Sequence, residues 1–187
     1  MNFEYIASKD LLEESWGNGT RHTLFKERGT VPFPWEIDCF VTEWNQHGVF
    51  QKGEDGERVL IALEGAPLLR TGDREQCLSP LTVAEYFSVD PMEVFGSCKL
   101  FHISLSETAF AQINVRKMHP GTAYHFKDLP FKTLLYCYDW PMLLRKNHFE
   151  QNLYPGDVLI LTNDSSEEIS LYSDREQFLI VDEFSHQ

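Results

Sequence analysis

One stretch of the chain predicts its fold: Gly56-Glu-Arg58-Val-Leu-Ile-Ala-Leu-Glu-Gly65-Ala-Pro67-Leu-Leu69. It contains a polar turn, an apolar run, a Glu-Gly turn and a second apolar run. The same order of apolar run, turn, proline and apolar run returns about 75 residues later, in Lys132-Thr-Leu-Leu-Tyr-Cys-Tyr-Asp139-Trp-Pro141-Met-Leu-Leu144. Short apolar runs bounded by Gly, Pro and Asp turns are typical of β-strands. The pattern therefore predicts a duplicated β unit.

The correspondence continues downstream of both stretches, with two prolines in register. Gln76-Cys-Leu78-Ser-Pro80-Leu-Thr-Val83 matches Gln151-Asn-Leu153-Tyr-Pro155-Gly-Asp-Val158. A repeat built from short strands predicts an all-β fold with two tandem antiparallel β-sandwich or jelly-roll barrels. We expect residues 1–110 to form an N-terminal barrel and residues 111–187 to form a C-terminal barrel, packed as one compact unit.

The N-terminal barrel is expected to begin with a helical or turn segment. In Ser8-Lys-Asp10-Leu-Leu-Glu13-Glu14 a capping residue precedes acidic side chains, which favours a short helix. Farther along, apolar Trp35, Ile37, Cys39 and Val41 alternate with Glu36, Asp38, Phe40 and Thr42. This period of two predicts a half-buried strand.

Composition excludes several classes of partner. The formal net charge of the 187-residue chain is −13, so its surface would repel nucleic acid and anionic lipid. No apolar stretch approaches the roughly 20 residues of a membrane span, and the N-terminus lacks the basic start and apolar core of a signal peptide. The four cysteines are scattered singly, which favours reduced thiols. We therefore expect a soluble cytoplasmic protein.

The barrel prediction can be tested against the motif of a metal-binding cupin. That motif has two His separated by one residue, then a Glu, then a Gly seven positions after the Glu, and a second motif supplies a third His. Three imidazoles and one carboxylate then converge on a divalent metal. If Gly65 is the final glycine, the Glu position holds Arg58, and the third His position falls near Met92. The first barrel is predicted to hold no metal and no cofactor.

The second barrel offers a similarly poor set of ligands. His125 stands at the spacing of the first His, but Lys127, Lys132 and Glu167 occupy the other three positions. One imidazole and one carboxylate make a weak transition-metal site. A cluster of His125 with Lys127 and Lys132 is either a second anion site or a solvated rim.

At this point the chain resembles the HutD/Ves family of bicupins. The family's Gly-Pro-Phe…Asp-Arg…Leu-Glu-Gly stretch is similar to Gly48-Val-Phe50, a seven-residue interval, Arg58 and then Leu63-Glu64-Gly65. Its N-terminal Trp-Lys-Asn-Gly-Gly-Gly-x-Thr signature is similar to Trp16-Gly17-Asn18-Gly19 with Thr23, and Trp35 fits the Trp that begins the next strand. The sequence departs from the signature at Gly17, Thr20 and Arg21. The family's Asp-x-Asn-x-Met strand reads Leu100-Phe-His102-Ile-Ser104 here.

The resemblance implies a bicupin fold and a small-molecule-binding role. HutD members are linked to histidine utilisation and are thought to bind a small acidic intermediate as governors of expression, with no established catalytic activity. An arginine inside a barrel agrees with an anionic ligand, because its guanidinium stays charged and offers two parallel donors to a carboxylate. We expect the ligand site to contain Arg58, His102, Trp16, Asn18 and Tyr86, and a small acidic metabolite to be the partner, with a homodimer as the default assembly.

Each candidate residue also has a structural interpretation. Arg58 can pair with Glu57, Glu64 or Glu85 at a strand end, His102 can be a satisfied core histidine, and Trp16 can cap a core. Two other classes of function stay open. One is a metal-free isomerase or epimerase that uses His102 with Glu85 or Tyr86 as acid and base, and the other is a protein-interaction module. A buried polar pocket around Arg58 would favour the ligand-binding classes over the interaction module.

Overall fold

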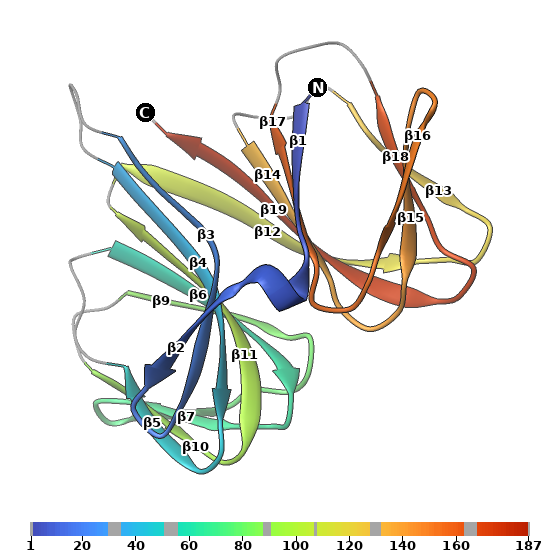
Figure 1. The fold of residues 1–187 in the computed structure, drawn as a ribbon. Coiled ribbons are helices and arrows are strands. Elements are labelled where there is room, and N and C mark those ends of the chain that lie inside the picture. Colours follow the sequence, from blue (N-terminus) through green and yellow to red (C-terminus); the bar gives the residue numbers. More distant parts are fainter. Residues whose placement is uncertain are drawn as a thin grey trace. The chain divides into compact units, whose positions relative to one another are not determined.

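The computed structural model describes residues 2–29, 35–50, 56–87, 91–106, 108–127, 132–162 and 168–186. Within these ranges the protein is all-β, with one short 3₁₀-helix at Ser8–Asp10 (Figure 1). Its contacts divide the chain into two units. We call Leu12–Ala109 the central unit, and Met1–Leu11 together with Phe110–His186 the terminal unit. No helix long and apolar enough to cross a membrane occurs in the described part of the chain.

The central unit contains two antiparallel sheets. The larger has six strands in the order β2 (Leu12–Trp16), β3 (Gly19–Gly29), β4 (Trp35–Trp44), β11 (Cys98–Ser106), β6 (Gly56–Glu64) and β9 (Val83–Phe87). The smaller has four strands in the order β5 (His47–Phe50), β10 (Met92–Phe95), β7 (Leu68–Thr71) and β8 (Arg74–Cys77). One buried cluster takes side chains from both sheets, among them Phe40, Leu60 and Leu100 from the larger and Phe50, Leu69 and Met92 from the smaller.

The Glu-Gly turn that the sequence predicts follows β6. Gly65 has a φ of 77°, and a Cβ at this position would lie 2.4 Å from the carbonyl oxygen of Ser97. Only glycine fits a left-handed conformation with so close a backbone neighbour. The turn therefore ends β6 at Glu64 and directs the chain into β7.

The terminal unit also contains two antiparallel sheets. Five strands follow the order β1 (Asn2–Ile6), β17 (Val158–Thr162), β14 (Lys132–Cys137), β19 (Gln177–His186) and β12 (Ala109–Met118). Four strands follow the order β13 (Ala123–Phe126), β18 (Ile169–Tyr172), β15 (Met142–Lys146) and β16 (Phe149–Leu153). A buried cluster that includes Leu135, Leu144, Leu159, Leu171 and Val181 forms its core.

The two units share an order of strands. In the central unit the larger sheet contains the order β4-β11-β6-β9 and the smaller sheet has the order β5-β10-β7-β8. In the terminal unit the larger sheet contains the order β12-β19-β14-β17 and the smaller sheet has the order β13-β18-β15-β16. Each strand of the second set is numbered eight above its counterpart in the first. The first apolar runs of the two repeated stretches form β6 and β14, which hold the same place in their sheets.

The N-terminal segment differs from the expectation in two ways. The helix predicted over Ser8–Glu14 is wrong beyond Asp10, because β2 begins at Leu12 and pairs with β3. Strand pairing over five residue pairs supplies hydrogen bonds that a short capped helix cannot match. Residues 1–11 also lie in the terminal unit and not in a unit with residues 12–110, since β1 pairs with β17 from Asn2↔Thr162 to Ile6↔Val158.

Candidate functional site

The central unit contains a partly open cavity of about 260 Å³ with polar and aromatic walls. A single row of cross-strand neighbours supplies much of the polar wall: Asp38 on β4 pairs with Ser104 on β11, Ser104 with Arg58 on β6, and Arg58 with Tyr86 on β9. Directly paired residues on adjacent strands project from the same face of a sheet. The antiparallel register therefore brings four residues that are distant in sequence to one wall of the cavity.

Arg21 on β3 joins this wall because of a β-bulge. The β3–β4 register shifts between Thr23, which pairs with Phe40, and Phe25, which pairs with Cys39. Residues 21 and 26 would lie on opposite faces of a regular strand, because side chains alternate. The extra residue in the bulge restores them to one face, and both Arg21 and Lys26 contact Asp38.

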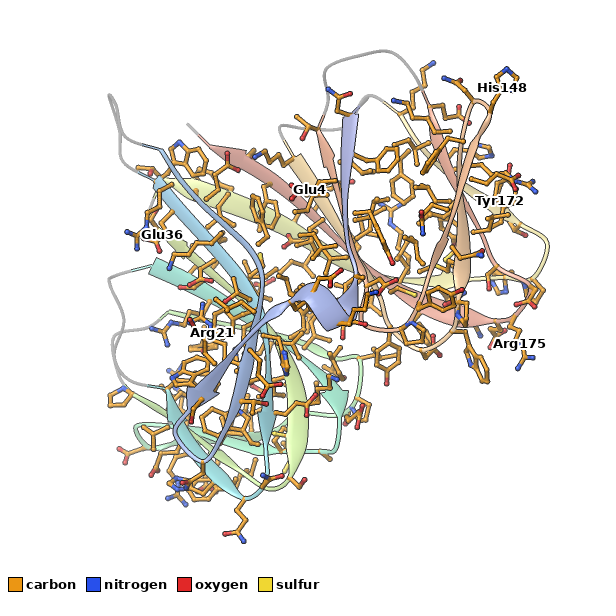
Figure 2. All side chains as sticks on the ribbon, in the orientation of Figure 1. Glu4, Arg21, Glu36, His148, Tyr172 and Arg175 are labelled. Atoms are coloured by element: carbon orange, nitrogen blue, oxygen red, sulfur yellow. The ribbon has the colours of Figure 1, made fainter. Side chains whose placement is uncertain are left out.

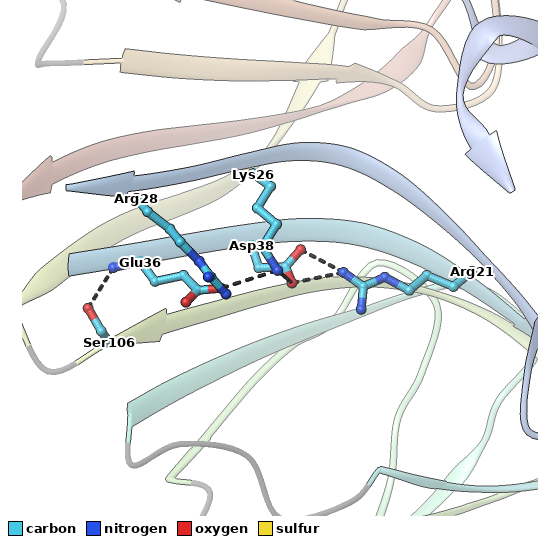
Figure 3. Close-up of polar contacts among 6 residues, drawn as sticks. All are labelled: Arg21, Lys26, Arg28, Glu36, Asp38 and Ser106. Carbon is cyan, nitrogen blue, oxygen red and sulfur yellow. Dashed lines mark hydrogen bonds and ion pairs between the residues drawn. The ribbon is translucent and has the colours of Figure 1, made fainter. Parts of the chain in front are cut away.

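Basic residues of β3 and acidic residues of β4 form a ladder of ion pairs that leads to the cavity (Figure 3). Arg28 Nη2 lies 2.9 Å from Glu36 Oε1, and Lys26 Nζ lies 3.2 Å from both Glu36 Oε1 and Asp38 Oδ2. Arg21 Nη2 then lies 2.7 Å from Asp38 Oδ1 and 2.8 Å from Oδ2. Asp38 thus has two cationic partners, one on the cavity side and one farther along the ladder.

The guanidinium of Arg21 is held against aromatic rings. Its central carbon lies 4.0 Å from the ring centroid of Phe40 and 5.2 Å from that of Trp16, distances at which cation–π attraction operates. Figure 2 shows Arg21 among the strands of the central unit. Arg21 Nε is buried and has no hydrogen-bond partner within the described residues. An N–H donor in the cavity wall is therefore available to a ligand.

Tyr86 supplies a second available donor. Burial raises the pKa of the Tyr86 phenol to about 12, although the nearby Arg58 guanidinium acts in the opposite direction. The side chain is therefore a protonated phenol at neutral pH. Its hydroxyl is buried and has no hydrogen-bond partner in the part of the chain that the structure describes.

The uncharged imidazole of His102 lines the cavity. Its Nε2 lies 2.8 Å from Thr42 Oγ1, which also accepts a hydrogen bond of 3.0 Å from Trp44 Nε1. The imidazole stacks on Phe40 at a centroid distance of 4.7 Å and an interplanar angle of 10°. Burial, and after it the charges of Arg21 and Arg58, hold the pKa of His102 well below its usual value of 6.5. One ring nitrogen is thus engaged within the core while the ring borders the cavity.

The structure brings most of the sequence-predicted site residues together. Arg58, His102, Trp16 and Tyr86 all line the cavity. Asn18 does not line it: its exposed amide donates a hydrogen bond of 3.3 Å to the backbone carbonyl of His47. The signature that contains Asn18 therefore contributes Trp16 to the cavity, and its Asn belongs to the turn between β2 and β3.

Sequence reasoning missed Arg21 and Asp38. Asp38 belongs to the polar side of a strand predicted to be half-buried, but Asp38, Phe40 and Thr42 are all buried, as are Ile37, Cys39 and Val41. The prediction was wrong because β4 is an inner strand whose polar side faces the cavity and not solvent. The sequence signal that could have revealed them was the match of basic residues on β3 with acidic residues on β4. The bulge in β3 breaks the regular spacing of the basic residues and so hides this match.

The corresponding positions of the terminal unit lack these groups. Thr133 is the counterpart of Arg58, because each lies two positions before a core leucine, Leu135 and Leu60 respectively. On the neighbouring strands Thr133 pairs with Leu161 and Glu183. Leu161 stands at the position that Tyr86 holds in the central unit, and Val181, which pairs with Leu135, stands at that of His102. The row of arginine, phenol and imidazole side chains therefore belongs to the central unit.

The residues weighed as metal ligands lie in ordinary structural settings. His125 is exposed, and its Nδ1 contacts Glu168 and lies 3.1 Å from Ser170 Oγ, so both oxygens meet the same nitrogen. Met92 is buried in the core of the central unit, and Glu167 lies outside the described residues. Among the residues that the structure describes, no group of three or more His, Cys, Asp or Glu side chains could hold a metal ion.

The fold is shared with solved structures over the full chain. A conserved protein of unknown function from Pseudomonas aeruginosa PAO1 matches with a TM-score of 0.82 and 14% identity, over 99% of this chain and 100% of that one. HutD from Pseudomonas fluorescens SBW25 matches with a TM-score of 0.75 and 16% identity, over 100% of both chains. A cupin 2 conserved barrel domain protein from Leptotrichia buccalis matches with a TM-score of 0.60 and 10% identity, over 98% of this chain and 96% of that one.

Comparison of the sequence itself adds no relative. No protein-family model matches the chain, and no curated protein matches it. At these identities the structural likeness establishes the fold alone, and that is enough to confirm the expected likeness to HutD-type cupins. The chain has the all-β fold of HutD and other cupin proteins.

Proposed function

We propose that this protein binds a small carboxylate in the cavity of its central unit, without a metal, and acts as a sensor or regulator of that acid. One observation carries the proposal: two guanidinium groups, Arg21 and Arg58, line a cavity where Arg21 Nε and the Tyr86 hydroxyl lack partners among the described residues. Buried donors are normally satisfied. A carboxylate has acceptor sites for several donors at once, and hydrogen bonds to it are strengthened by its charge.

The charges that line the cavity also favour an anion. Arg21 and Arg58 contribute two positive charges and Asp38 one negative charge, while His102 and Tyr86 are neutral at pH 7. The cavity therefore carries a net charge of +1 in a chain whose formal net charge is −13. A positive, partly dehydrated pocket attracts an anion more strongly than the same charges would in open water.

We propose that the chain is a bicupin whose barrels derive from an internal repeat, with a boundary near residue 110. The shared order of strands in the two units supports this proposal, as does the change of unit after Ala109. The regulatory role rests on the resemblance to HutD, a cytoplasmic location on the singly scattered cysteines of the sequence, and the carboxylate on the cavity itself.

The geometry gives less support to an isomerase or epimerase. Glu85 pairs with Val59 and is exposed, while its neighbour Tyr86 points into the core. His102 and Glu85 therefore do not share a cavity wall as an acid–base pair. A phenol with a pKa of about 12 is a weak acid at neutral pH.

Thermal-shift measurements with formate, acetate, propionate and succinate test the proposal, with sodium chloride at matched ionic strength as the reference. An acid at about 100 times its Kd should stabilise the protein by roughly 2.7 kcal/mol. Arg58→Ala should weaken binding by about 30-fold to 1000-fold, and Arg58→Lys should recover part of the loss because the charge remains without the fork.

Arg145→Ala serves as the matched control, since Arg145 is an exposed arginine paired with Glu150 in the terminal unit. It should leave carboxylate binding unchanged. An Arg58→Ala protein that melts early yet binds the acids with unchanged affinity would give Arg58 a structural role and leave the protein-interaction module as the better explanation.

A further inference from the structure

We infer that the ligand is an extended carboxylic acid, with its carboxylate in the first cavity and its chain in a second cavity that Tyr86 borders. This inference rests on the proposed function and names the class of acid. The second cavity has a volume of about 350 Å³ and lies in the same unit. Tyr86 is the one residue that lines both cavities among those described, so the two cavities meet at this residue.

The strand order explains why a second cavity exists here. β9 is the last strand of the six-stranded sheet, and β8 is the last strand of the four-stranded sheet. The cavity is lined from these two edge strands and from β7 and β10. No described strand pairs with the outer edge of β8 or β9, so the sandwich is left open between them. An opening between sheet edges gives the chain of a bound acid a path away from Arg58.

The lining of the second cavity suits an apolar chain that ends in an uncharged polar group. Leu69, Ala84 and Met92 are buried and form an apolar floor. Arg74 and Glu85, which also line the cavity, carry opposite charges that cancel. Thr71 and Gln76 complete the rim, and within the described residues their side chains make no hydrogen bond. Methylene groups would cover the floor, and a terminal hydroxyl or amide would meet the rim.

Three acids of increasing reach test the inference: propionate, hexanoate and 6-hydroxyhexanoate. Calorimetric titration of the full chain should show affinity rising by up to about fourfold for each added methylene that is buried. The terminal hydroxyl should raise the affinity again or leave it unchanged. A hydroxyl acid that binds much more weakly than hexanoate would contradict a polar rim.

Ala84→Met places a larger side chain on the floor of the second cavity. It should reduce the affinity for hexanoate to about that for propionate and leave propionate binding unchanged. Thr71→Leu, at the rim, gives a second test with a milder change of volume should Ala84→Met not fold. Thr162→Leu on β17 is the matched control, because it makes the same substitution in the terminal unit.

The outcomes separate this inference from the proposed function. Equal affinity for propionate and hexanoate, or hexanoate binding that survives both cavity-filling variants, would overturn the extended ligand while leaving carboxylate binding intact. Propionate binding that Arg58→Ala abolishes supports the proposed function by itself. If no acid binds to the wild type, the proposed function fails and this inference fails with it.

Discussion

Arg21 holds both carboxylate oxygens of Asp38 through a single nitrogen, with Nη2 at 2.7 Å from Oδ1 and 2.8 Å from Oδ2. The contact leaves Nε of the same guanidinium without a partner in the described part of the chain. Lys26 takes part in neutralising Asp38 from the other side, at 3.2 Å. Asp38 therefore positions Arg21 over the ring of Phe40 while leaving part of its donor set for a ligand.

Asp38→Asn should destabilise the unliganded protein by about 1–3 kcal/mol, because it removes the carboxylate that Arg21 contacts. Added propionate should then stabilise the variant more than it stabilises the wild type, since an external carboxylate can supply the negative charge that Asp38 no longer provides to Arg21. Chemical denaturation at fixed ionic strength measures both effects. Glu150→Gln, which weakens the exposed pair with Arg145, is the control. Equal stabilisation of the variant and the wild type would contradict a shared anion site at Arg21.

Tyr86→Phe should stabilise the unliganded protein and weaken carboxylate binding. Removing a buried hydroxyl that has no hydrogen-bond partner among the described residues relieves a desolvation cost of about 1–2 kcal/mol, and the same change deletes a donor to the ligand. The raised pKa adds a second signature. Folding raises the pKa of the Tyr86 phenol from 10.0 to about 12. The contribution of this raised pKa to the stability of the wild type is present below pH 10 and is lost as the pH rises toward 12, because the unfolded chain releases the phenolic proton first.

Denaturation curves from pH 9 to 12 should therefore fall more steeply for the wild type than for Tyr86→Phe. Tyr154→Phe, which alters an exposed phenol, should follow the wild type. A destabilised Tyr86→Phe protein with unchanged propionate affinity would show that the hydroxyl has a structural partner and no ligand role.

The fold could be predicted from the sequence further than the site could. The strands could be predicted from local sequence, because the turn at Gly65 has room for glycine alone and the segments on either side of it are apolar runs typical of strands. The site depends on register between strands. Arg21 and Lys26 both contact Asp38, because a bulge at Leu24 brings them to one face of β3. Their odd spacing of five residues would place them on opposite faces of a regular strand. The pairing of β1 with β17 joins segments more than 150 residues apart, and no local pattern records it.

His102 should make the stability of the protein depend on pH below neutrality. Its folded pKa lies well below 6.5 because of burial and the charges of Arg21 and Arg58, so the unfolded chain takes up a proton that the folded protein refuses. This stabilisation is fully present above about pH 6.5 and is lost as the pH falls below that value. The loss approaches about 1.4 kcal/mol per pH unit for one proton.

His102→Gln should remove that contribution and flatten the stability curve between pH 6.5 and 5, measured by urea denaturation. His148→Gln changes an exposed histidine of the terminal unit (Figure 2) and should leave the slope as in the wild type. Equal slopes for the wild type and His102→Gln would mean that the imidazole is protonated in the folded protein.

The purified protein should carry no stoichiometric metal. The glutamate of the cupin metal motif is replaced by Arg58, whose charge would repel a divalent cation, and the position of the third histidine falls near Met92, in the buried core. Elemental analysis after expression in metal-supplemented medium measures this. Near one equivalent of zinc, iron, manganese or nickel per chain would overturn the interpretation of the cavity as an anion site.

Asp157 should hold the N-terminal strand to the terminal unit. Its carboxylate accepts hydrogen bonds from the Tyr5 hydroxyl at 2.8 Å, from the Ser8 amide at 2.8 Å and from the Tyr154 amide at 2.7 Å. Asp157→Ala leaves three donors without their charged acceptor and should cost about 2–4 kcal/mol. Tyr5→Phe removes one of these bonds and should cost about 1–2 kcal/mol, because the other two remain.

Hydrogen exchange locates the effect of the Asp157 and Tyr5 variants. Amides of β1 and β17 should exchange faster in both variants, since their pairing loses its anchor at Ile6↔Val158. Propionate binding should stay as in the wild type, because the cavity is built from the central unit alone. Loss of propionate binding in Tyr5→Phe, whose fold should be the less disturbed of the two, would show that the N-terminal strand supports the cavity as well as the sheet to which it belongs.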